Sequence, residues 1–581
     1  MLAKLNFALL NYAVLVAVLA ACWGVGRLAL RGANTAPVAG MLHPLATTLG
    51  LGVGICALQA LAVAGLLNRS AVLACLAIGL VLAALQWRSG RDVAPRPSAG
   101  GASPTWTAPA RCVAMVVAVL LLGTALAPLR PPMEWDELAY HLPHARQWAL
   151  HGQLVVTPWL RYPWFPYNFD LLFSGALLFD NDVLPHLLHA SAGWLVAWLV
   201  LRLGLRHFTP LTACVATGIW LILSRDDYSR AYVDMGVTLF VLAGCIAFDA
   251  WRQTGSRRWL VVAAFALGVA AGAKYQVLAF LPLFAIVLAW RERRVSAWLL
   301  ATAALLLPCI YWYARNALLT GDPFNPVGGK LFGFSDWNLG DYAGQFDDLR
   351  SHVGLPHWLL WAAPLAALWP TQRRSAWVRG AAIFSAWALL AWAASSRYPR
   401  YLMPAFPLLG LLSAAGWVWL ATRLRWRPAG AWRDRAAVWT PRLLAGLAVV
   451  VAALVVVRGA RNIAPDPAQR DALLRSRIPG YSLLRQLDAQ PQGRIYQIGL
   501  EGAIYYAPNP IWGDWFGPWR YRDFLGLEPA ALHAALARQD FDTLLIDTSR
   551  FPDVVARPGF DRYFKKVQGD QSVLLYRLQP P

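Results

Sequence analysis

Two adjacent carboxylates, Asp136 and Glu137, stand in segment 131–141, directly after a hydrophobic run. Charged carboxylates beside a membrane-spanning helix cost free energy, so they usually mark a functional site rather than a packing solution. A carboxylate at such a place can take a proton from a hydroxyl group as that hydroxyl attacks a substrate. The pair is therefore the first candidate for general-base chemistry. The competing interpretation is a solvated helix start, because carboxylates also favour the N-terminus of a helix.

Further charged residues stand at the ends of other apolar runs. Asp234 opens one run and Lys274 separates two short ones. Arg397 and Arg400 precede another. Lysine and arginine can hold a phosphate and stabilise it as it leaves, so these cations are candidate ligands for a phosphorylated donor. Ordinary alternatives remain for each of them: a helix N-cap for the aspartate, and contact with lipid headgroups for the cations.

Aromatic and polar residues near these charges are candidates for substrate contact. The stretch 158–167 alternates aromatic residues with prolines, and its rings suit stacking on a sugar or lining a polyprenyl groove. The substrate-contact candidates are Tyr140, His141, Trp164, Arg315 and Tyr401.

A metal site is the less favoured interpretation of the histidines. His141 and His144 have a spacing that would allow them to bind a metal with Asp136 on a helix. Pro143 lies between them, and no third strong ligand accompanies them. We therefore expect no metal ion and no other cofactor.

The composition is that of a protein with many membrane spans. Hydrophobic residues make up 58% of the 581 and charged residues only 14%, where a soluble domain would carry roughly a quarter. The net charge of +21 comes from basic residues dispersed in short loops, which is the pattern of topology control and not of nucleic-acid binding. All seven cysteines lie in or beside apolar runs, so disulfides and a cysteine-bound metal are not expected.

Hydropathy predicts about fourteen membrane spans. They lie near 7–30, 45–67, 70–87, 111–129, 183–204, 209–224, 235–251, 259–273, 276–290, 297–318, 357–370, 380–396, 401–421 and 443–458. Arginine-rich loops alternate with less basic ones, and the positive-inside rule makes the arginine-rich side cytoplasmic. The candidate residues then share the opposite face, which in a bacterium is the periplasm.

We predict an α-helical polytopic membrane protein with a small C-terminal α/β domain outside the cytoplasm. The predicted parts are three N-terminal helices (1–87), a cytoplasmic linker (88–110), a transmembrane catalytic core (111–458) with a large loop (130–182), and the C-terminal domain (459–581). Strands are predicted in that domain at 494–499, 543–547 and 572–576, and helices at 478–489 and 529–539.

Residues 111–421 resemble the GT-C superfamily of membrane glycosyltransferases, near its protein mannosyltransferase and aminoarabinose transferase branch. The matching positions are 135–141, Asp234, 272–274, 315–316, 320–323 and 400–404. The resemblance implies a polyprenyl-phosphate sugar as donor, Asp136 as general base, and the basic residues as ligands of the donor phosphate. The three N-terminal spans lie outside the family's core pattern, and 158–170 lacks the run of prolines that many relatives carry.

The expected function is transfer of a sugar from a polyprenyl-phosphate donor to a periplasmic hydroxyl with inversion at C1. Glu137 and Asp234 would orient the acceptor or the base. The acceptor is left open between a lipid, a glycan and a protein, and the expected location is the bacterial inner membrane. Alternative functions are a transporter or flippase, a scaffold for envelope assembly, and a ligase for lipid-linked glycans.

Overall fold

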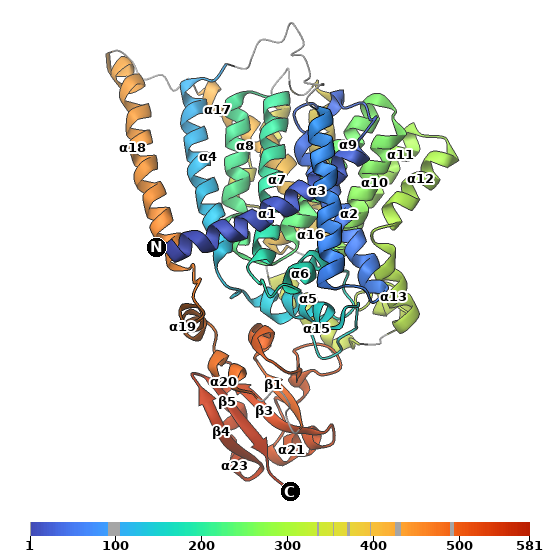
Figure 1. Ribbon diagram of the computed structural model, residues 1–581, viewed down its shortest axis with the longest axis vertical. Coiled ribbons are helices and arrows are strands. Elements are labelled where there is room, and N and C mark those ends of the chain that lie inside the picture. The colour runs from blue at the N-terminus through green and yellow to red at the C-terminus, as the bar shows by residue number, and fades with distance from the viewer. Residues whose placement is uncertain are drawn as a thin grey trace.

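The computed structural model is mostly helical, with a small sheet domain beneath one end of the helical bundle (Figure 1). The residues that it describes are 2–90, 105–333, 336–351, 354–368, 372, 374–395, 397–424, 431–487 and 493–580. Of the predicted linker 88–110, residues 91–104 lie outside this described part.

The first three helices form a packed group at the N-terminus. They are α1 (Leu2–Ala29), α2 (Leu42–Val63) and α3 (Arg69–Gly90), and α1 runs obliquely across its neighbours (Figure 1). Glycines let α1 and α2 approach closely: a Cβ on Gly26 would lie 1.7 Å from the Ala46 carbonyl oxygen, and one on Gly50 equally close to that of Cys22. Small residues of this kind allow close helix packing within a membrane.

The remaining bundle follows the predicted runs closely. Its helices are α4 (Ala108–Leu126), α7 (Leu184–His207), α8 (Pro210–Leu223), α9 (Asp234–Thr254), α10 (Arg257–Ala271), α11 (Leu281–Arg291), α12 (Val295–Leu306), α13 (Ile310–Thr320), α16 (Ala376–Ser395), α17 (Phe406–Arg423) and α18 (Ala431–Arg461). Short 3-10 turns join them: η1 (Ala36–Val38), η2 (Ala127–Leu129), η4 (Arg225–Ser229), η5 (Tyr275–Ala279) and η8 (Pro399–Ala405).

Eight described helices are long and apolar enough to cross a membrane, or nine if the bent pair α12–α13 counts as one span. That pair bends by 72°. Because α8, α10 and α11 have only 14, 15 and 11 residues, they are shorter than the roughly 20 residues that a straight span needs. The count of fourteen spans therefore stays a prediction.

The span predicted at 357–370 is wrong within its described part. Residues 358–368 form two 3-10 turns, η6 (Trp358–Leu360) and η7 (Ala363–Leu368), in place of an α-helix. Pro364 lacks an amide donor, which disfavours a continuous helix through this short run. The turns are held against α17 instead, where the Ser413 hydroxyl and Trp417 indole donate to the Leu359 carbonyl at 2.7 and 3.1 Å.

Short helices cover the end of the bundle that faces the sheet domain. A single π-helical turn, η3 (Glu137–His141), leads into α5 (Leu142–His151), and α6 (Asp170–Leu177) follows. Two more, α14 (Gly329–Phe332) and α15 (Leu339–Ser351), lie in the loop after α13. Isolated π turns often occur at functional sites, and this one begins directly after Asp136.

The sheet domain confirms the three predicted strands and adds two more. Its five strands run in the order β2-β1-β3-β5-β4, parallel between β2, β1 and β3 and antiparallel beyond them. They are β1 (Arg494–Ile498), β2 (Ile511–Trp512), β3 (Phe541–Asp547), β4 (Phe564–Asp570) and β5 (Val573–Leu578). The helices and turns are α19 (Pro467–Arg477), α20 (Tyr481–Gln486), η9 (Glu501–Tyr506), η10 (Tyr521–Asp523), α21 (Pro529–Ala537), α22 (Pro552–Val555) and α23 (Phe560–Tyr563).

The sheet domain has a hydrophobic core of its own, centred on side chains such as Tyr496, Leu544 and Phe564. The turn η9 belongs elsewhere: Tyr505 and Tyr506 pack with the large hydrophobic core of the bundle. The domain is therefore joined to the bundle through η9 and not only through the chain that enters it from α18.

Candidate active site

Four charged residues from distant parts of the chain meet at the end of the bundle that faces the sheet domain. Arg400 forms an ion pair with Asp136, and Lys274 Nζ lies 2.5 Å from Asp234 Oδ1. The ring of Tyr401 lies beside both cations, 4.7 Å from Lys274 Nζ and 5.9 Å from Arg400 Cζ. We call Asp136, Asp234, Lys274 and Arg400 the charged cluster.

Local structure explains how each member reaches the cluster. Asp136 directly precedes the π turn, and Asp234 is the first residue of α9. Lys274 is extended (φ −160°, ψ 131°) between α10 and η5, where the helix is broken, and Arg400 lies in the 3-10 turn before α17. Val233 and not Asp234 is the N-cap residue of α9, and the Asp234 side chain accepts from Lys274.

The cations of the cluster keep part of their surface open. The side chains of Lys274 and Arg400 are 19% and 22% exposed, against 5% and 11% for Asp234 and Asp136. Arg400 Nε is buried and has no hydrogen-bond acceptor among the described residues. The exposed parts of Lys274 and Arg400 would present two positive groups to a phosphate that approaches the cluster.

Glu137 differs from its neighbour Asp136 in having both oxygens fully engaged. One oxygen accepts from the backbone amides of Met133 and Glu134 at 2.6 and 2.8 Å. The other accepts from the Ala231 amide at 2.6 Å and lies 2.8 Å from His186 Nε2. Burial raises the pKa of Glu137, but His186 and the amides outweigh it and hold that pKa below its ordinary value. Glu137 thus fixes the turn that carries Asp136, and it has no free lone pair for an acceptor proton.

Tyr232 also lies at the charged cluster, but its sequence position did not mark it as a candidate, although it is only two residues before Asp234. Its hydroxyl accepts from the Asp136 amide at 3.4 Å, and Arg400 Cζ lies 5.4 Å from its ring. Burial raises the pKa of Tyr232 above its ordinary value, and the Asp136 carboxylate raises it further. The tyrosine therefore stays neutral between Asp136 and Arg400.

Tyr140 and His141 line the same region. The ring of Tyr140 lies 4.3 Å from that of His141 and 5.3 Å from that of Tyr162. His141 Nδ1 lies 2.7 Å from Oδ1 of the fully buried Asp170, which fixes the ring. Asp170 was also missed in the sequence, because nothing nearby marks it as the partner of a histidine 29 residues earlier.

The two histidines considered for metal binding turn to different partners. His144 Nε2 donates to the Arg161 carbonyl at 2.9 Å, and its Nδ1 accepts from the Thr157 hydroxyl at 2.8 Å. Burial lowers the pKa of His144 to about 3, which matches this neutral tautomer. Among the described residues, no group of three or more His, Cys, Asp or Glu side chains is arranged to hold a metal ion.

Trp164 and Arg315 form a second group beside Lys274. Arg315 Cζ lies 5.5 Å from the Trp164 ring. The Trp164 carbonyl accepts from Asn316 Nδ2 at 2.7 Å and from the Tyr275 hydroxyl at 3.3 Å. Tyr275 follows Lys274 in the chain, so this group adjoins the cluster without joining its ion pairs.

Arg397 is not brought into the cluster. Its side chain is exposed, and no ion pair or hydrogen bond joins it to any other residue that the structure describes. Only two residues separate it from Arg400, which lies in η8 and pairs with Asp136. Sequence position alone did not distinguish the two arginines.

A buried ion-pair group ties the loop after α5 to the sheet domain. Arg161 Nε lies 2.8 Å from Asp514 Oδ1, and Arg161 Nη2 lies 3.6 Å from Glu501 Oε1. Burial disfavours the charged guanidinium, but Asp514 and Glu501 raise the pKa of Arg161 above its ordinary value. We call Arg161, Glu501 and Asp514 the junction.

The junction also supports the segment that leads into Asp136. Arg161 Cζ lies 4.6 Å from the Trp135 ring, and the Tyr506 hydroxyl donates to the Pro132 carbonyl at 2.6 Å. A Cβ on Gly502 would come within 2.6 Å of the Trp135 ring, so only glycine fits there without movement. Tyr506 and Gly502 are more than 350 residues from Pro132 and Trp135 in the chain, and no local sequence signal indicates these two contacts.

Comparison with known sequences finds relatives without an assigned activity. A family described as SF2091/S2213 matches residues 469–577, which include most of the sheet domain. Uncharacterized protein SF2093/S2215 of Shigella flexneri is 29% identical over 137 residues, covering 22% of this chain and 66% of that protein. Uncharacterized protein SF2092/S2214 of the same organism is 28% identical over 131 residues, covering 20% and 70%. The chain therefore matches about two thirds of the length of these relatives.

Comparison with solved structures finds similar folds at low sequence identity. ArnT from Cupriavidus metallidurans, in the apo state and bound to undecaprenyl phosphate, is 16% identical; each match covers 81% of this chain and 99% of ArnT, with TM-scores of 0.49 and 0.48. The oligosaccharyltransferase AglB from Archaeoglobus fulgidus, in complex with an inhibitory peptide and a dolichol-phosphate, is 12% identical over 81% of this chain and 74% of AglB, with a TM-score of 0.44. All three TM-scores are below 0.5.

Proposed function

We propose that this protein is a GT-C-type membrane glycosyltransferase that moves a sugar from a polyprenyl-phosphate donor to an acceptor hydroxyl with inversion at C1. The observation that carries the proposal is the charged cluster, in which two carboxylates and two partly exposed cations meet around Tyr401. A base for the acceptor and cations for the departing phosphate are the two requirements of this reaction.

Asp136 is the proposed general base. It accepts the acceptor's hydroxyl proton as the hydroxyl oxygen bonds to C1 of the sugar and the bond between C1 and the phosphate oxygen breaks. The electron pair of that bond leaves with the polyprenyl phosphate. No general acid is needed on the leaving side, because the phosphate is already ionised.

Lys274 and Arg400 are the proposed ligands of the donor phosphate. In the structure each is neutralised by its own carboxylate, so the cluster carries no net charge before substrate arrives. A phosphate that draws Arg400 away from Asp136 would free the Asp136 oxygen for the acceptor. Asp136 would then become available as a base only when the donor phosphate has bound.

The surrounding residues complete the proposed site. Glu137 holds the turn of Asp136 in place, and Asp234 holds Lys274. Tyr140, His141 and Tyr401 are proposed to contact the sugar or the acceptor. We propose Trp164 and Arg315 as contacts further along the donor. Arg397 is exposed and is not retained as a phosphate ligand.

The proposed setting is the bacterial inner membrane, with the cluster and the sheet domain on the periplasmic side. No metal ion or other cofactor enters the proposed reaction. The acceptor is a lipid, a glycan or a protein. A transporter would place its charged groups inside the spans, near the bilayer midplane. Here Asp234 is the first residue of its helix and Arg400 precedes α17, which supports an enzyme over a transporter.

The test is transfer of radiolabelled sugar from polyprenyl-phosphate donors in membranes that contain the wild type or Asp136→Asn. We expect the variant to lose roughly 10²- to 10⁴-fold in rate, the usual contribution of a general base. The matched control is Asp226→Asn, an exposed aspartate that pairs with Arg225 at 3.5 Å, and we expect it to keep the wild-type rate. Equal rates for wild type and Asp136→Asn would exclude Asp136 as the base. Absence of transfer from every donor would favour transport or scaffolding.

A further inference from the structure

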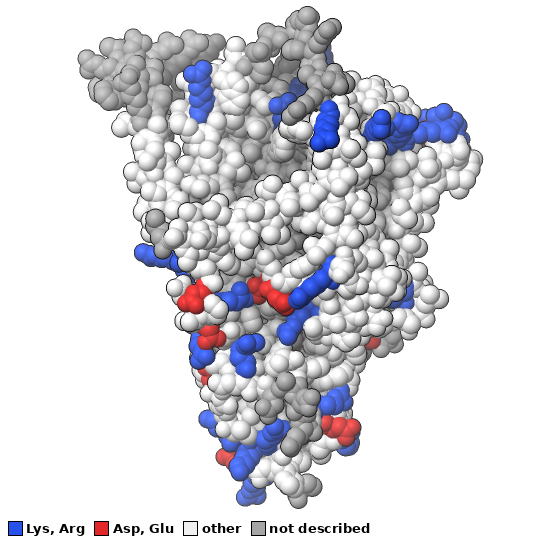
Figure 2. Space-filling view, viewed as in Figure 1, with Lys and Arg blue, Asp and Glu red and all other residues white. Residues whose placement is uncertain are grey.

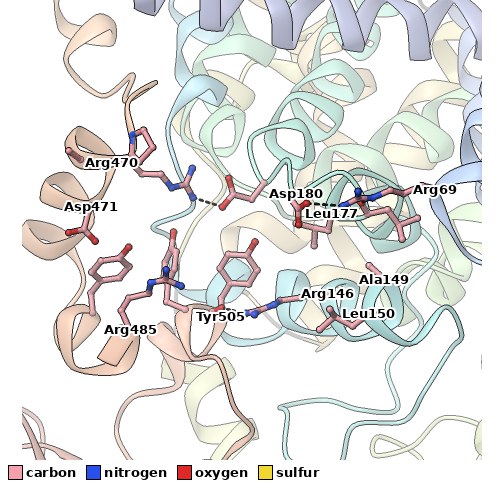
Figure 3. Close-up of a pocket in the computed structure, with 16 residues that line it drawn as sticks. Arg69, Arg146, Ala149, Leu150, Leu177, Asp180, Arg470, Asp471, Arg485 and Tyr505 are labelled. Atoms are coloured by element: carbon pink, nitrogen blue, oxygen red, sulfur yellow. Dashed lines mark hydrogen bonds and ion pairs between the residues drawn. The ribbon is translucent and has the colours of Figure 1, made fainter. Parts of the chain in front are cut away.

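A large cavity lies between the bundle and the sheet domain, apart from the charged cluster (Figure 3). Its volume is about 800 Å³, and its walls come from the start of α3, from α5 and the end of α6, and from α19, α20 and η9. None of the four cluster residues lines it. The turn η9 lies between the cavity and the segment that leads to the charged cluster. Its Tyr506 lines the cavity, and the Tyr506 hydroxyl donates to the carbonyl of Pro132, four residues before Asp136.

The cavity carries an excess of positive charge once its ion pairs are counted. Each of its three aspartates has an arginine partner: Asp180 with Arg69 at 2.8 Å, Asp182 with Arg470, and Asp471 with Arg475 at 2.6 Å. Two lining arginines, Arg146 and Arg485, form no ion pair with a described residue. Two positive charges are therefore left without a compensating carboxylate.

These two arginines also have hydrogen-bond donors to spare. A guanidinium has five N–H donors. Arg146 uses one nitrogen, which donates to the carbonyls of Tyr505 and Ala507 at 2.9 and 3.3 Å. Arg485 is exposed and makes no hydrogen bond to any described residue. Figure 3 shows Arg485 and Arg146 on either side of Tyr505, extending from the sheet domain and from α5.

The surroundings of the cavity are those of a membrane surface. Arg69 is the first residue of α3, a helix long and apolar enough to cross a bilayer. Two apolar side chains near Arg69 are exposed. Leu150 lines the cavity and is 66% exposed, and Phe179, which follows the lining residue Leu178, is 40% exposed. Figure 2 shows charged side chains gathered at the level of the cavity and below, while the bundle surface above it is uncharged almost to its far end.

We propose that this cavity binds the phosphate group of a membrane lipid. Arg146 and Arg485 hold the phosphate from opposite sides, since guanidinium groups bind phosphate oxygens through paired, charge-assisted hydrogen bonds. The acyl chains lie along Leu150 and Phe179, outside the charged wall. The site is separate from the charged cluster, so the proposal does not depend on glycosyl transfer.

The test is a binding titration of the purified full chain in detergent with three probes, read by calorimetry. The probes are dioctanoyl phosphatidic acid, inorganic phosphate, and dioctanoyl glycerol, which has the acyl chains without the phosphate. We expect phosphatidic acid to bind more tightly than either of the others, with a Kd that rises with salt because the contact is ionic. Equal binding by inorganic phosphate would overturn the assignment to a lipid, and equal binding by dioctanoyl glycerol would overturn the role of the phosphate.

Variants locate the site. We expect Arg485→Gln to raise the Kd for phosphatidic acid about tenfold, the effect of one lost charge-assisted hydrogen bond, and Arg485→Glu to raise it further. The matched control is Arg538→Gln, which replaces the exposed arginine directly after α21 whose side chain donates to the Ala534 carbonyl, and it should leave the Kd unchanged. Because Arg485 supports no other residue, its replacement leaves the fold intact. An unchanged Kd in Arg485→Glu, or an equal rise in Arg538→Gln, would contradict the proposal.

Discussion

The charged cluster and the junction both consist of ion pairs, but the cations of the two regions differ in their exposure. Both join aspartates to cations supplied by distant parts of the chain. In the cluster the cations are about one-fifth exposed, whereas the Arg161 side chain at the junction is only 8% exposed and meets two carboxylates. A cation that keeps open surface can exchange its carboxylate for a substrate phosphate. A buried cation between two carboxylates fixes one part of the molecule against another.

The same contrast separates two neighbours in the chain. Asp136 has one ionic partner, Arg400, at a partly open site. Glu137 is fully buried and accepts three backbone amides in addition to facing His186. We therefore propose a catalytic role for a carboxylate from its hydrogen-bond partners and its exposure to substrate, and not from its residue type.

The largest stability effect of a substitution at neutral pH is expected at the junction. Asp514→Asn leaves Arg161 buried with only Glu501 as a more distant partner, and breaking a buried ion pair costs about 3–5 kcal/mol. The readout is the free energy of unfolding of the full chain in detergent. Asp542→Asn, which removes an exposed pair with Arg577, is the matched control and should cost less than about 1 kcal/mol. Equal effects from the two variants would remove the contrast between buried and exposed pairs.

The next largest effect is expected in donor affinity. Lys274→Gln removes one cation from the cluster, and a charge-assisted hydrogen bond contributes about 1.5–3 kcal/mol. The Kd for undecaprenyl phosphate should rise roughly 10- to 100-fold, as measured by calorimetry on the purified chain. Arg397→Gln removes an equal charge at a position outside the cluster and should leave the Kd as it is. A larger effect from Arg397 would mean that the donor phosphate binds elsewhere.

A pH effect should arise from the buried His144. Its pKa in the folded state, about 3, lies below its ordinary value near 6.5, so the unfolded chain takes up the proton first as the pH falls. The stability associated with neutral His144 is complete above pH 6.5 and declines from there towards pH 3, by about 1.4 kcal/mol per pH unit. The difference in unfolding free energy between the wild type and His144→Gln should follow that slope. A difference that stays constant from pH 7 to pH 4 would show that folding does not lower the pKa of His144.

The smallest effect is expected from a single hydrogen bond between η9 and the segment before Asp136. Tyr506→Phe removes the hydroxyl that donates to the Pro132 carbonyl and should cost about 1 kcal/mol. Tyr505→Phe is the control, because the Tyr505 hydroxyl has no hydrogen-bond partner among the described residues. Thermal unfolding of both variants checks the difference. Identical midpoints would mean that the Tyr506 bond does not stabilise the attachment of η9.

Helices were predictable because long apolar runs bounded by charged loops have few alternatives in a membrane. The errors came where that signal was weak: segment 357–370 is short and contains Pro364, and it forms 3-10 turns. In the sheet domain β2 has only two residues, and β4 is mostly exposed and polar, so neither has the apolar pattern of a buried strand.

The charged cluster was predictable in part. Asp136, Asp234, Lys274 and Arg400 were identified because charges at the ends of apolar runs are rare. Their pairing, the position of Arg397 and the role of η9 depend on contacts between residues far apart in the chain. Asp514, for example, binds an arginine 353 residues away.

The most direct test measures sugar transfer and thermal stability side by side in Asp136→Asn and Asp514→Asn. We predict that Asp136→Asn loses transfer while its unfolding midpoint falls much less than that of Asp514→Asn, because Arg400 is more exposed than Arg161. We predict the reverse for Asp514→Asn, a lowered midpoint with transfer retained at temperatures where the protein is folded. Transfer at the wild-type rate in Asp136→Asn would contradict the assignment of the charged cluster as the active site.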